Sequence, residues 1–217
     1  MKFKGELHQV KLINFSVEKE ELNGLLPKEL KLFDYHGRAL ISMVDVHLKN
    51  MKMTSFMPSF SYRHLAFRVL VDDTEFNQEE PKGIYFLQSF SSNPLMVVGG
   101  NMIANYQLNL AKIESSFNTL KIQQKDKFLH YALSGSDAVK NEDLFTVIKR
   151  IDRAYAAKNN KVEVTRITRK EWPIKPVSLL NFETNYFKTA RLEGAFEVGK
   201  VIHYVWEKPE LVQRKLL

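Results

Sequence analysis

Hydrophobic and polar residues alternate along most of this chain with the period of two that is typical of β-strands. The segment RHLAFRVLVDD, residues 63–73, shows the alternation most clearly. One face of the predicted strand is wholly apolar and carries Leu65, Phe67, Val69 and Val71. The other face is mixed and carries His64, Ala66, Arg68 and Leu70. We therefore predict a strand here whose apolar face packs against another layer.

Similar alternation predicts further strands before and after this one. Residues 30–53 predict two strands joined around Asp34–Gly37. Residues 84–90, IYFLQSF, predict the hairpin partner of the strand at 63–73. The other predicted strands are residues 105–116, a hairpin over 153–167 with its turn at Asn159-Asn160, and two strands within 187–199 and 200–207.

Only short helices are predicted between these strands. They are residues 17–27 with Ser16 as N-cap, a segment that starts at Asn93-Pro94, and residues 141–150. Pro173 and Pro176 lack N–H donors, so residues 172–177 are not expected in the middle of a sheet.

Many strands and few helices predict a mainly β (α+β) fold. We expect an antiparallel sheet, curled or closed into a barrel, with a few short flanking helices. No boundary along the sequence is strong enough to divide the chain, so residues 1–217 are expected to form a single domain.

Composition narrows the classes of function. The 217 residues are 44% hydrophobic and include no cysteine, which excludes disulfides, thiolate zinc sites and cysteine nucleophiles. The N-terminal residues lack the apolar core of a signal peptide, and the longest uncharged stretch, residues 83–111, is too polar to span a membrane. We therefore expect a cytoplasmic protein without a membrane partner.

The net charge of +7 arises entirely in the C-terminal part of the chain, where residues 121–217 hold 19 basic and 12 acidic side chains. A basic half can indicate nucleic-acid binding. Here the basic residues are interleaved with Glu and Asp along predicted strands, which favours a solvated surface over a nucleic-acid site.

Motifs for common catalytic sites are missing. Gly99-Gly100 is followed by neither the Gly-Lys-Ser/Thr of a phosphate loop nor a third glycine, and we interpret it as close helix packing. The six histidines show no metal-binding spacing, and SGSDA at 134–138 has the wrong order for a serine nucleophile and predicts a turn. No cofactor and no metal are predicted.

His64 and Arg68 are the most informative candidates for a binding site. They lie four residues apart on the mixed face of one predicted strand and therefore point the same way. If that face lines a barrel interior, Arg68 is a buried cation that needs a carboxylate or an anionic ligand. If the face is exposed, Arg68 is an ordinary solvated side chain. Periodicity alone leaves both alternatives open.

Several segments, in order, resemble a known family. They are LLPKELKLFDYHGRALISMVDV, HLAFRVLV, GIYFLQSF, NYQLNLAKI and EWPIKPV, which together cover most of residues 15–180. They are similar to an uncharacterised bacterial group of the acetoacetate decarboxylase-like superfamily. The resemblance implies an antiparallel β-barrel or cone with a central cavity.

The resemblance also implies a missing catalytic group. True acetoacetate decarboxylases carry Gly-Gly-Arg-Glu followed by Phe-Pro-Lys-Lys, in which one lysine forms a Schiff base with the substrate. Here Asn101 and Met102 follow the two glycines, and no lysine occurs in residues 83–111 before Lys112. An imine-forming decarboxylase is therefore not expected, and whether the chain is an enzyme at all stays open.

The candidate ligand-binding residues are His64, Arg68, Asn105, Tyr106 and Asn109. Relatives typically show Leu-Pro-Tyr and Glu-Leu-Asn-Val-Arg segments, so the resemblance places Tyr106 at the tyrosine and Arg68 at the arginine, inside the cavity. His64 stands at the glutamate, and Asn105 replaces the proline. We expect a cavity for a small, anionic carboxylate or carbonyl ligand, either in an enzyme or in a binding module without chemistry. A nucleic-acid-binding protein is the less favoured reading, and a homo-oligomer is neither predicted nor excluded.

Overall fold

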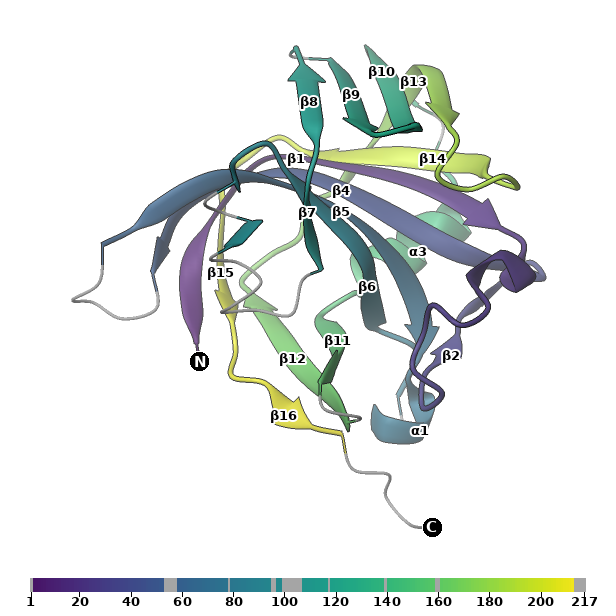
Figure 1. Ribbon diagram of the computed structural model, residues 1–217, viewed down its shortest axis with the longest axis vertical. Coiled ribbons are helices and arrows are strands. Elements are labelled where there is room, and N and C mark those ends of the chain that lie inside the picture. Colours follow the sequence, from purple (N-terminus) through teal and green to yellow (C-terminus); the bar gives the residue numbers. More distant parts are fainter. Residues whose placement is uncertain are drawn as a thin grey trace.

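A computed structural model describes residues 2–52, 58–77, 79–94, 97–98, 107–116, 118–138, 140–158 and 161–212. Seven of its strands close into a barrel (Figure 1). In barrel order they are β4 (Arg38–Lys52), β5 (Phe60–Asp72), β6 (Gly83–Ser91), β11 (Arg153–Lys158), β12 (Lys161–Arg169), β15 (Ile202–Trp206) and β1 (Phe3–Val17). The β1–β4 pairing closes the ring, and β6–β11 is its one parallel pair among the described residues. The predicted β-rich, closed fold is confirmed.

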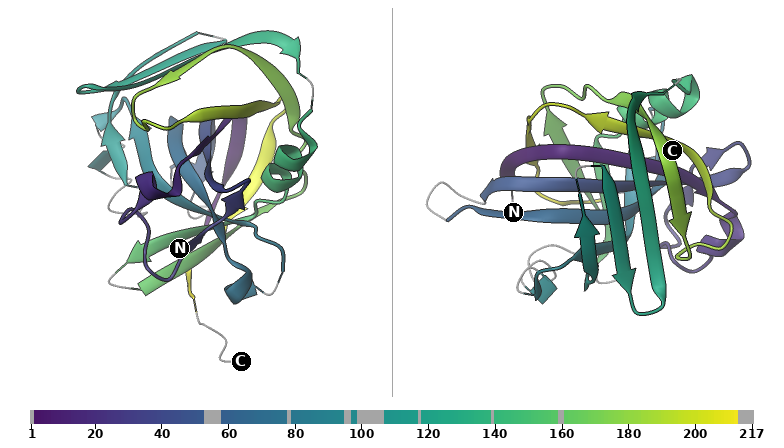
Figure 2. Two further views of the ribbon diagram at one scale, coloured as in Figure 1. Left: turned by 90° about the vertical axis from the view of Figure 1, so that its right-hand side faces the viewer. Right: turned by 90° about the horizontal axis from the view of Figure 1, so that it is seen from above.

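Strand β1 has different partners along its two halves. Residues Phe3–Leu7 pair with β15, whereas Val10–Ser16 pair with β14 (Arg191–Val198). The sheet continues from β14 through β13 (Lys175–Thr184), β10 (Lys127–Asp137), β9 (Thr119–Gln124) and β8 (Lys112–Ser115). Figure 2 shows this extension arching over the outside of the barrel. The result is a second layer that covers one barrel wall.

The two faces of β5 consequently belong to two cores. Leu65, Phe67, Val69 and Val71 are buried between the barrel wall and the second layer, together with residues such as Tyr131 of β10. Ala66 and Leu70 face the barrel interior. Both faces are therefore covered, and the face-by-face prediction for this strand holds.

Short elements complete the fold. Among the elements whose bounds are described, the helices are the 3-10 turn η1 (Lys19–Leu22), α1 (Thr74–Asn77) and α3 (Glu142–Lys149), and the short strands are β2 (Lys31–Leu32), β3 (Asp34–Tyr35), β7 (Leu108–Leu110) and β16 (Glu210–Leu211). The helix predicted at 141–150 is confirmed as α3, which Asn141 caps by accepting the N–H of Leu144. Its buried residues, Leu144, Val147 and Ile148, pack into the barrel-interior cluster.

Other local predictions need correction. Ser16 is not a helix cap but a buried residue of β1, where it pairs with Leu40, and the helix shrinks to η1. SGSDA is not a turn, because β10 continues to Asp137 to pair with β13. Pro176 lies inside β13, but at its second position, where the strand has just begun. The strand predicted over 105–116 is broken at Ala111 into β7 and β8.

Some predicted features lie outside the described residues. These are the turn at Asn159-Asn160 and the pair Gly99-Gly100. The predicted helix start is described only in part, where the N–H of Val97 donates to the carbonyl of Asn93 at 3.2 Å. In the part of the chain that is described, no helix is long and apolar enough to cross a membrane.

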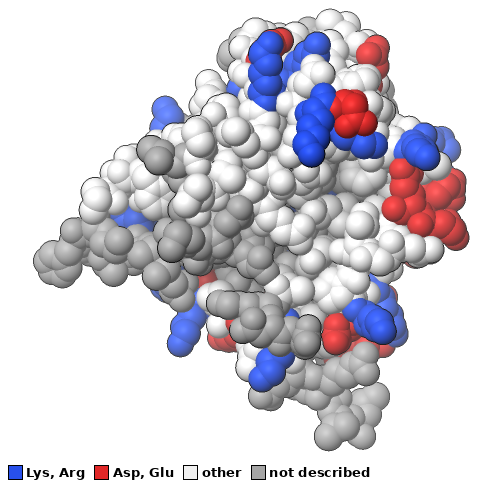
Figure 3. All heavy atoms as spheres, viewed as in Figure 1, with Lys and Arg blue, Asp and Glu red and all other residues white. Residues whose placement is uncertain are grey.

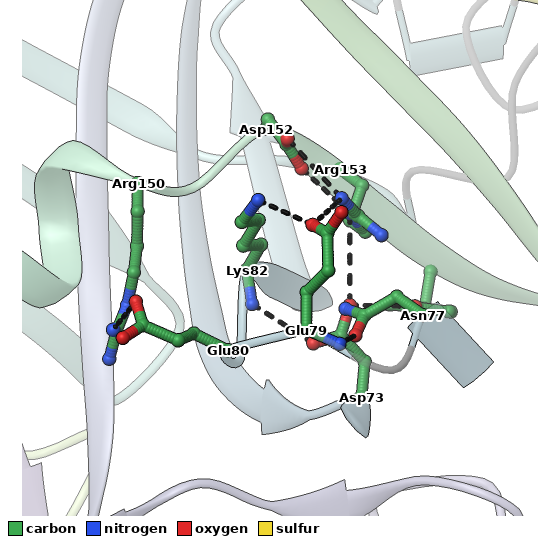
Figure 4. A network of polar contacts seen from close by, with 9 residues as sticks. Asp73, Asn77, Glu79, Glu80, Lys82, Arg150, Asp152 and Arg153 are labelled. Carbon is green, nitrogen blue, oxygen red and sulfur yellow. Dashed lines mark hydrogen bonds and ion pairs between the residues drawn. The ribbon is translucent and has the colours of Figure 1, made fainter. Parts of the chain in front are cut away.

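A polar network stabilises the barrel where β6 meets β11 (Figure 4). The parallel pairing of these two strands involves only Arg153–Tyr155 of β11. The fully buried carboxylate of Asp73 accepts the Tyr155 hydroxyl at 2.8 Å and the backbone N–H of Lys82 at 2.9 Å. Arg153 donates to Asp152 at 2.6 Å and approaches Asp73 at 3.8 Å. These contacts join the β5–β6 connection to β11.

Candidate ligand cavity

The barrel encloses a cavity of about 240 Å³. Its walls are mainly aliphatic and aromatic side chains from β1, β4, β5, β12 and β15, with Ile148 of α3 at one side. The basic residues among its described lining are His64, Arg68 and Arg169. No aspartate, glutamate or lysine is found among the described lining residues.

Strand β5 contributes a row of polar groups to this cavity. Tyr62, His64 and Arg68 all lie on the face that points inward, because they are separated by even numbers of residues. Across the β4–β5 ladder, Leu48 pairs with Tyr62, Val46 with His64 and Ser42 with Arg68. The mixed face seen in the sequence is therefore the wall of the cavity.

Arg68 is held against β4 by a single residue. Its Nε donates to the carbonyl of Ser42 at 3.2 Å, and its Nη2 donates to the Ser42 hydroxyl at 3.0 Å. No described carboxylate forms an ion pair with it. Burial, and then the positive charge of Arg169, lower the pKa of Arg68 to about 9. The guanidinium is thus a partly buried cation whose charge no described carboxylate balances.

Arg169 is a second cation at the cavity wall, and sequence analysis missed it. It donates to the carbonyl of Ile151, and its guanidinium lies 4.3 Å from the ring centre of Trp172. Burial lowers its pKa to about 10 although Asp152 acts in the opposite direction. The available signal was the alternation on β12, which puts Arg169 on the same face as the cavity-lining Ile167.

His64 is a neutral imidazole in this environment. Its exposed fraction is only 7%, and its ring makes edge-to-face contacts with Tyr62 and Phe86. Burial, followed by the charge of Arg68, lowers the pKa of His64 to about 4. At neutral pH it can therefore donate one hydrogen bond and accept another without adding a charge.

Tyr62 is a further polar group that sequence analysis did not single out. Its hydroxyl has no hydrogen-bond partner among the described residues, and burial raises its pKa. Tyr204, which also lines the cavity, instead donates its hydroxyl to the sulfur of Met51 at 3.1 Å. The signal that could have identified Tyr62 is its place on β5, two residues before His64 and therefore on the same face of the strand.

Of the other predicted site residues, the structure describes Asn109, which is not among the lining residues. Asn109 lies in β7 and donates its side-chain amide to the carbonyl of Gln107 at 2.7 Å. Its neighbour Leu108, rather than Asn109, is among the described lining residues. Asn105 and Tyr106 lie outside the described residues.

Lys112, the first lysine after the uncharged stretch, lies on the surface. Its side chain is 75% exposed and forms an ion pair with Glu114 at 2.6 Å. The hydrogen bond to Glu114 raises the pKa of Lys112, which favours its protonated form. Elsewhere in the described part of the chain, no three His, Cys, Asp or Glu side chains gather in a way that could hold a metal ion.

Comparison with known proteins places these features in context. Residues 4–208 match DUF2071, a family described as uncharacterized conserved protein. No curated protein matches the chain.

Solved structures show the same fold at low sequence identity. The acetoacetate decarboxylase of Legionella pneumophila subsp. pneumophila str. Philadelphia 1 has a TM-score of 0.66 at 12% identity, covering 98% of this chain and 88% of that one. An acetoacetate decarboxylase-like enzyme of Sphingomonas wittichii RW1 has a TM-score of 0.65 at 10% identity, covering 99% and 94%. The enduracididine biosynthesis enzyme MppR, in complex with pyruvate, has a TM-score of 0.59 at 9% identity, covering 98% and 90%.

Proposed function

Since the chain belongs to the DUF2071 family and has the barrel fold of acetoacetate decarboxylases, we propose that it binds a small carboxylate inside the barrel. Arg68 holds the anionic group, and His64 contacts the atoms next to it. The proposal concerns binding. Such a cavity is compatible with two functions. One is an enzyme that acts on a carbonyl or carboxylate compound, and the other is a sensing module that binds the compound without chemistry.

One observation carries this proposal: a partly buried guanidinium lines a mainly apolar cavity with no described carboxylate beside it. Removing an ion from water costs several kcal/mol unless an opposite charge or several hydrogen bonds compensate. Ser42 supplies two acceptors and no charge. A ligand carboxylate supplies the missing charge, and a planar guanidinium matches its two oxygens.

The structural neighbours support a small organic acid as the ligand. One of them, MppR, has been crystallised with pyruvate. Its sequence identity to this chain is 9%, so the likeness supports a small-molecule cavity in the same fold. The identity of the ligand has to be argued from the residues that line the cavity of this chain.

Schiff-base chemistry is not part of the proposal. Residues 53–57, 95–96 and 99–106, which lie outside the described part of the chain, contain no lysine. No lysine is among the described lining residues, and Lys112 is exposed and ion-paired. A neutral His64 beside Arg68 instead favours acid–base or hydrogen-bonding roles.

Nucleic-acid binding is the weaker alternative. On the face shown in Figure 3, basic side chains lie at the margins and several of them neighbour acidic ones. A duplex is bound through a continuous basic surface, and this face has none.

Thermal shift with a panel of small carboxylates tests the proposal. We expect stabilisation of the natural protein and its loss in Arg68→Met, which keeps the length of the side chain without the charge. Arg191→Met is the matched control, since Arg191 is 76% exposed on β14. If the carboxylates stabilise Arg68→Met as well as the natural protein, or stabilise neither, the proposed function is wrong.

A further inference from the structure

The cavity has a row of polar groups along β5 and is apolar over most of its other walls. Arg68, with Ser42 behind it, is the charged end of this row. Six residues earlier on β5 is Tyr62, about 20 Å along an extended strand, and Phe60 lies beyond it. Most residues of the other walls are apolar and include Leu12, Val44, Val46, Leu48, Phe86 and Trp206, whereas Arg169 is a second cation near Arg68.

Such walls disfavour a ligand that is polar throughout. A polar group buried without a hydrogen-bond partner loses its interactions with water, whereas apolar carbons gain from the same transfer. A short keto acid bound at Arg68 would leave most of these walls in contact with water or empty. A ligand with an apolar body would cover them.

The volume leaves room for such a body. A buried water needs about 10–15 Å³ of this kind of volume, so a cavity of about 240 Å³ has room for about sixteen water-sized groups. A six-carbon monocarboxylate, with eight non-hydrogen atoms, fits within this space. Pyruvate has fewer atoms and no apolar chain.

We propose that the natural ligand is an amphipathic monocarboxylate of at least about the size of hexanoate, with its carboxylate on Arg68 and its apolar body along the β1, β4 and β6 walls. This inference rests on the proposed carboxylate site and adds the chemical class of the ligand. A pocket for such a ligand differs in selectivity from a pocket that binds short keto acids.

Calorimetric titration with a homologous series tests the class. From acetate through butyrate to hexanoate we expect the affinity to rise about fourfold for each added methylene. Adipate has the same number of carbons as hexanoate but a second carboxylate, which the apolar walls would have to desolvate. We expect adipate to bind at least about tenfold more weakly than hexanoate.

A matched pair of variants locates the apolar body. Val46→Ala removes two methyl groups from the cavity wall, whereas Val69→Ala makes the same change on the buried outer face of the barrel. Across the carboxylate series, affinity stops rising at some chain length, and in Val46→Ala this length should be greater by one or two carbons. In Val69→Ala it should stay the same, and similar losses of melting temperature would show that both variants fold.

The outcomes separate this inference from the proposed function. Equal affinities for acetate, pyruvate and hexanoate, all abolished by Arg68→Met, would overturn the amphipathic ligand while leaving the carboxylate site intact. Adipate bound as tightly as hexanoate would overturn it too. Binding that survives Arg68→Met would instead contradict the proposed function itself.

Discussion

Arg68 and Ser42 lie directly opposite each other on β5 and β4, and both oxygens of Ser42 accept hydrogen bonds from the guanidinium. The contacts use Nε and Nη2, which fixes the plane of the guanidinium. Its Nη1 has no partner among the described residues, so this nitrogen is available to a ligand. Ser42 thereby positions the cation without neutralising it.

Ser42→Ala should weaken carboxylate binding by about three- to tenfold, because one charge-assisted hydrogen bond that orients Arg68 is lost. The dissociation constant for hexanoate measures this effect. Ser89→Ala is the control, since Ser89 is also fully buried but its hydroxyl has no hydrogen-bond partner in the described structure. An equal loss of affinity in both variants would contradict a positioning role for Ser42.

Stability should depend on pH through His64. Its pKa is about 4 in the folded protein, against about 6.5 for an unperturbed histidine, so between these values the unfolded chain binds more protons. The free energy of unfolding should therefore rise with pH from about 4 to 6.5, with up to about 3 kcal/mol from this residue. Below pH 4 both states are protonated, and no further loss is expected.

Urea denaturation at several pH values, compared with His64→Gln, isolates this contribution. The variant lacks the titrating group, so the difference in unfolding free energy between the two proteins should change across this window and be constant above it. Parallel curves for the two proteins would show that His64 is not kept neutral by its surroundings.

Local periodicity was enough to predict the wall of the cavity. Leu65 and Phe67 alternate with His64 and Arg68, and this pattern gave the strand, its two faces and its hairpin with β6. Periodicity alone left open whether the Arg68 side chain points into the barrel or to solvent. In the structure it lines the cavity inside the barrel. The hairpin of β9 and β10 was missed, although Leu120 and Ile122 alternate with polar residues in β9.

The position of Arg169 beside Arg68 could not be predicted in the same way. The two residues are about a hundred positions apart, and they meet only because β12 and β15 continue the ring that β1 closes. That closure depends on the register of long-range pairings, which no local pattern specifies. The second layer has the same origin, since β1 changes partners from β15 to β14 along its length.

Tyr155→Phe should destabilise the protein by about 1–3 kcal/mol, because it removes a hydrogen bond from the buried carboxylate of Asp73. Chemical denaturation measures the loss. Tyr186→Phe is the matched control, since the buried hydroxyl of Tyr186 has no hydrogen-bond partner in the part of the chain described. That change should be neutral or slightly stabilising. Equal effects of the two substitutions would mean that the Tyr155–Asp73 bond does not fasten β11 to the barrel.

Borohydride reduction in the presence of pyruvate should leave the mass of the protein unchanged. A Schiff base forms from a neutral amine, and enzymes obtain one by desolvating a lysine or placing a cation beside it. Lys112 has the opposite environment, because it is exposed and Glu114 raises its pKa. Mass spectrometry detects an adduct directly, and Lys112→Arg identifies its position. An adduct that appears rapidly at neutral pH and disappears in Lys112→Arg would mean that this lysine reacts as the decarboxylase lysine does.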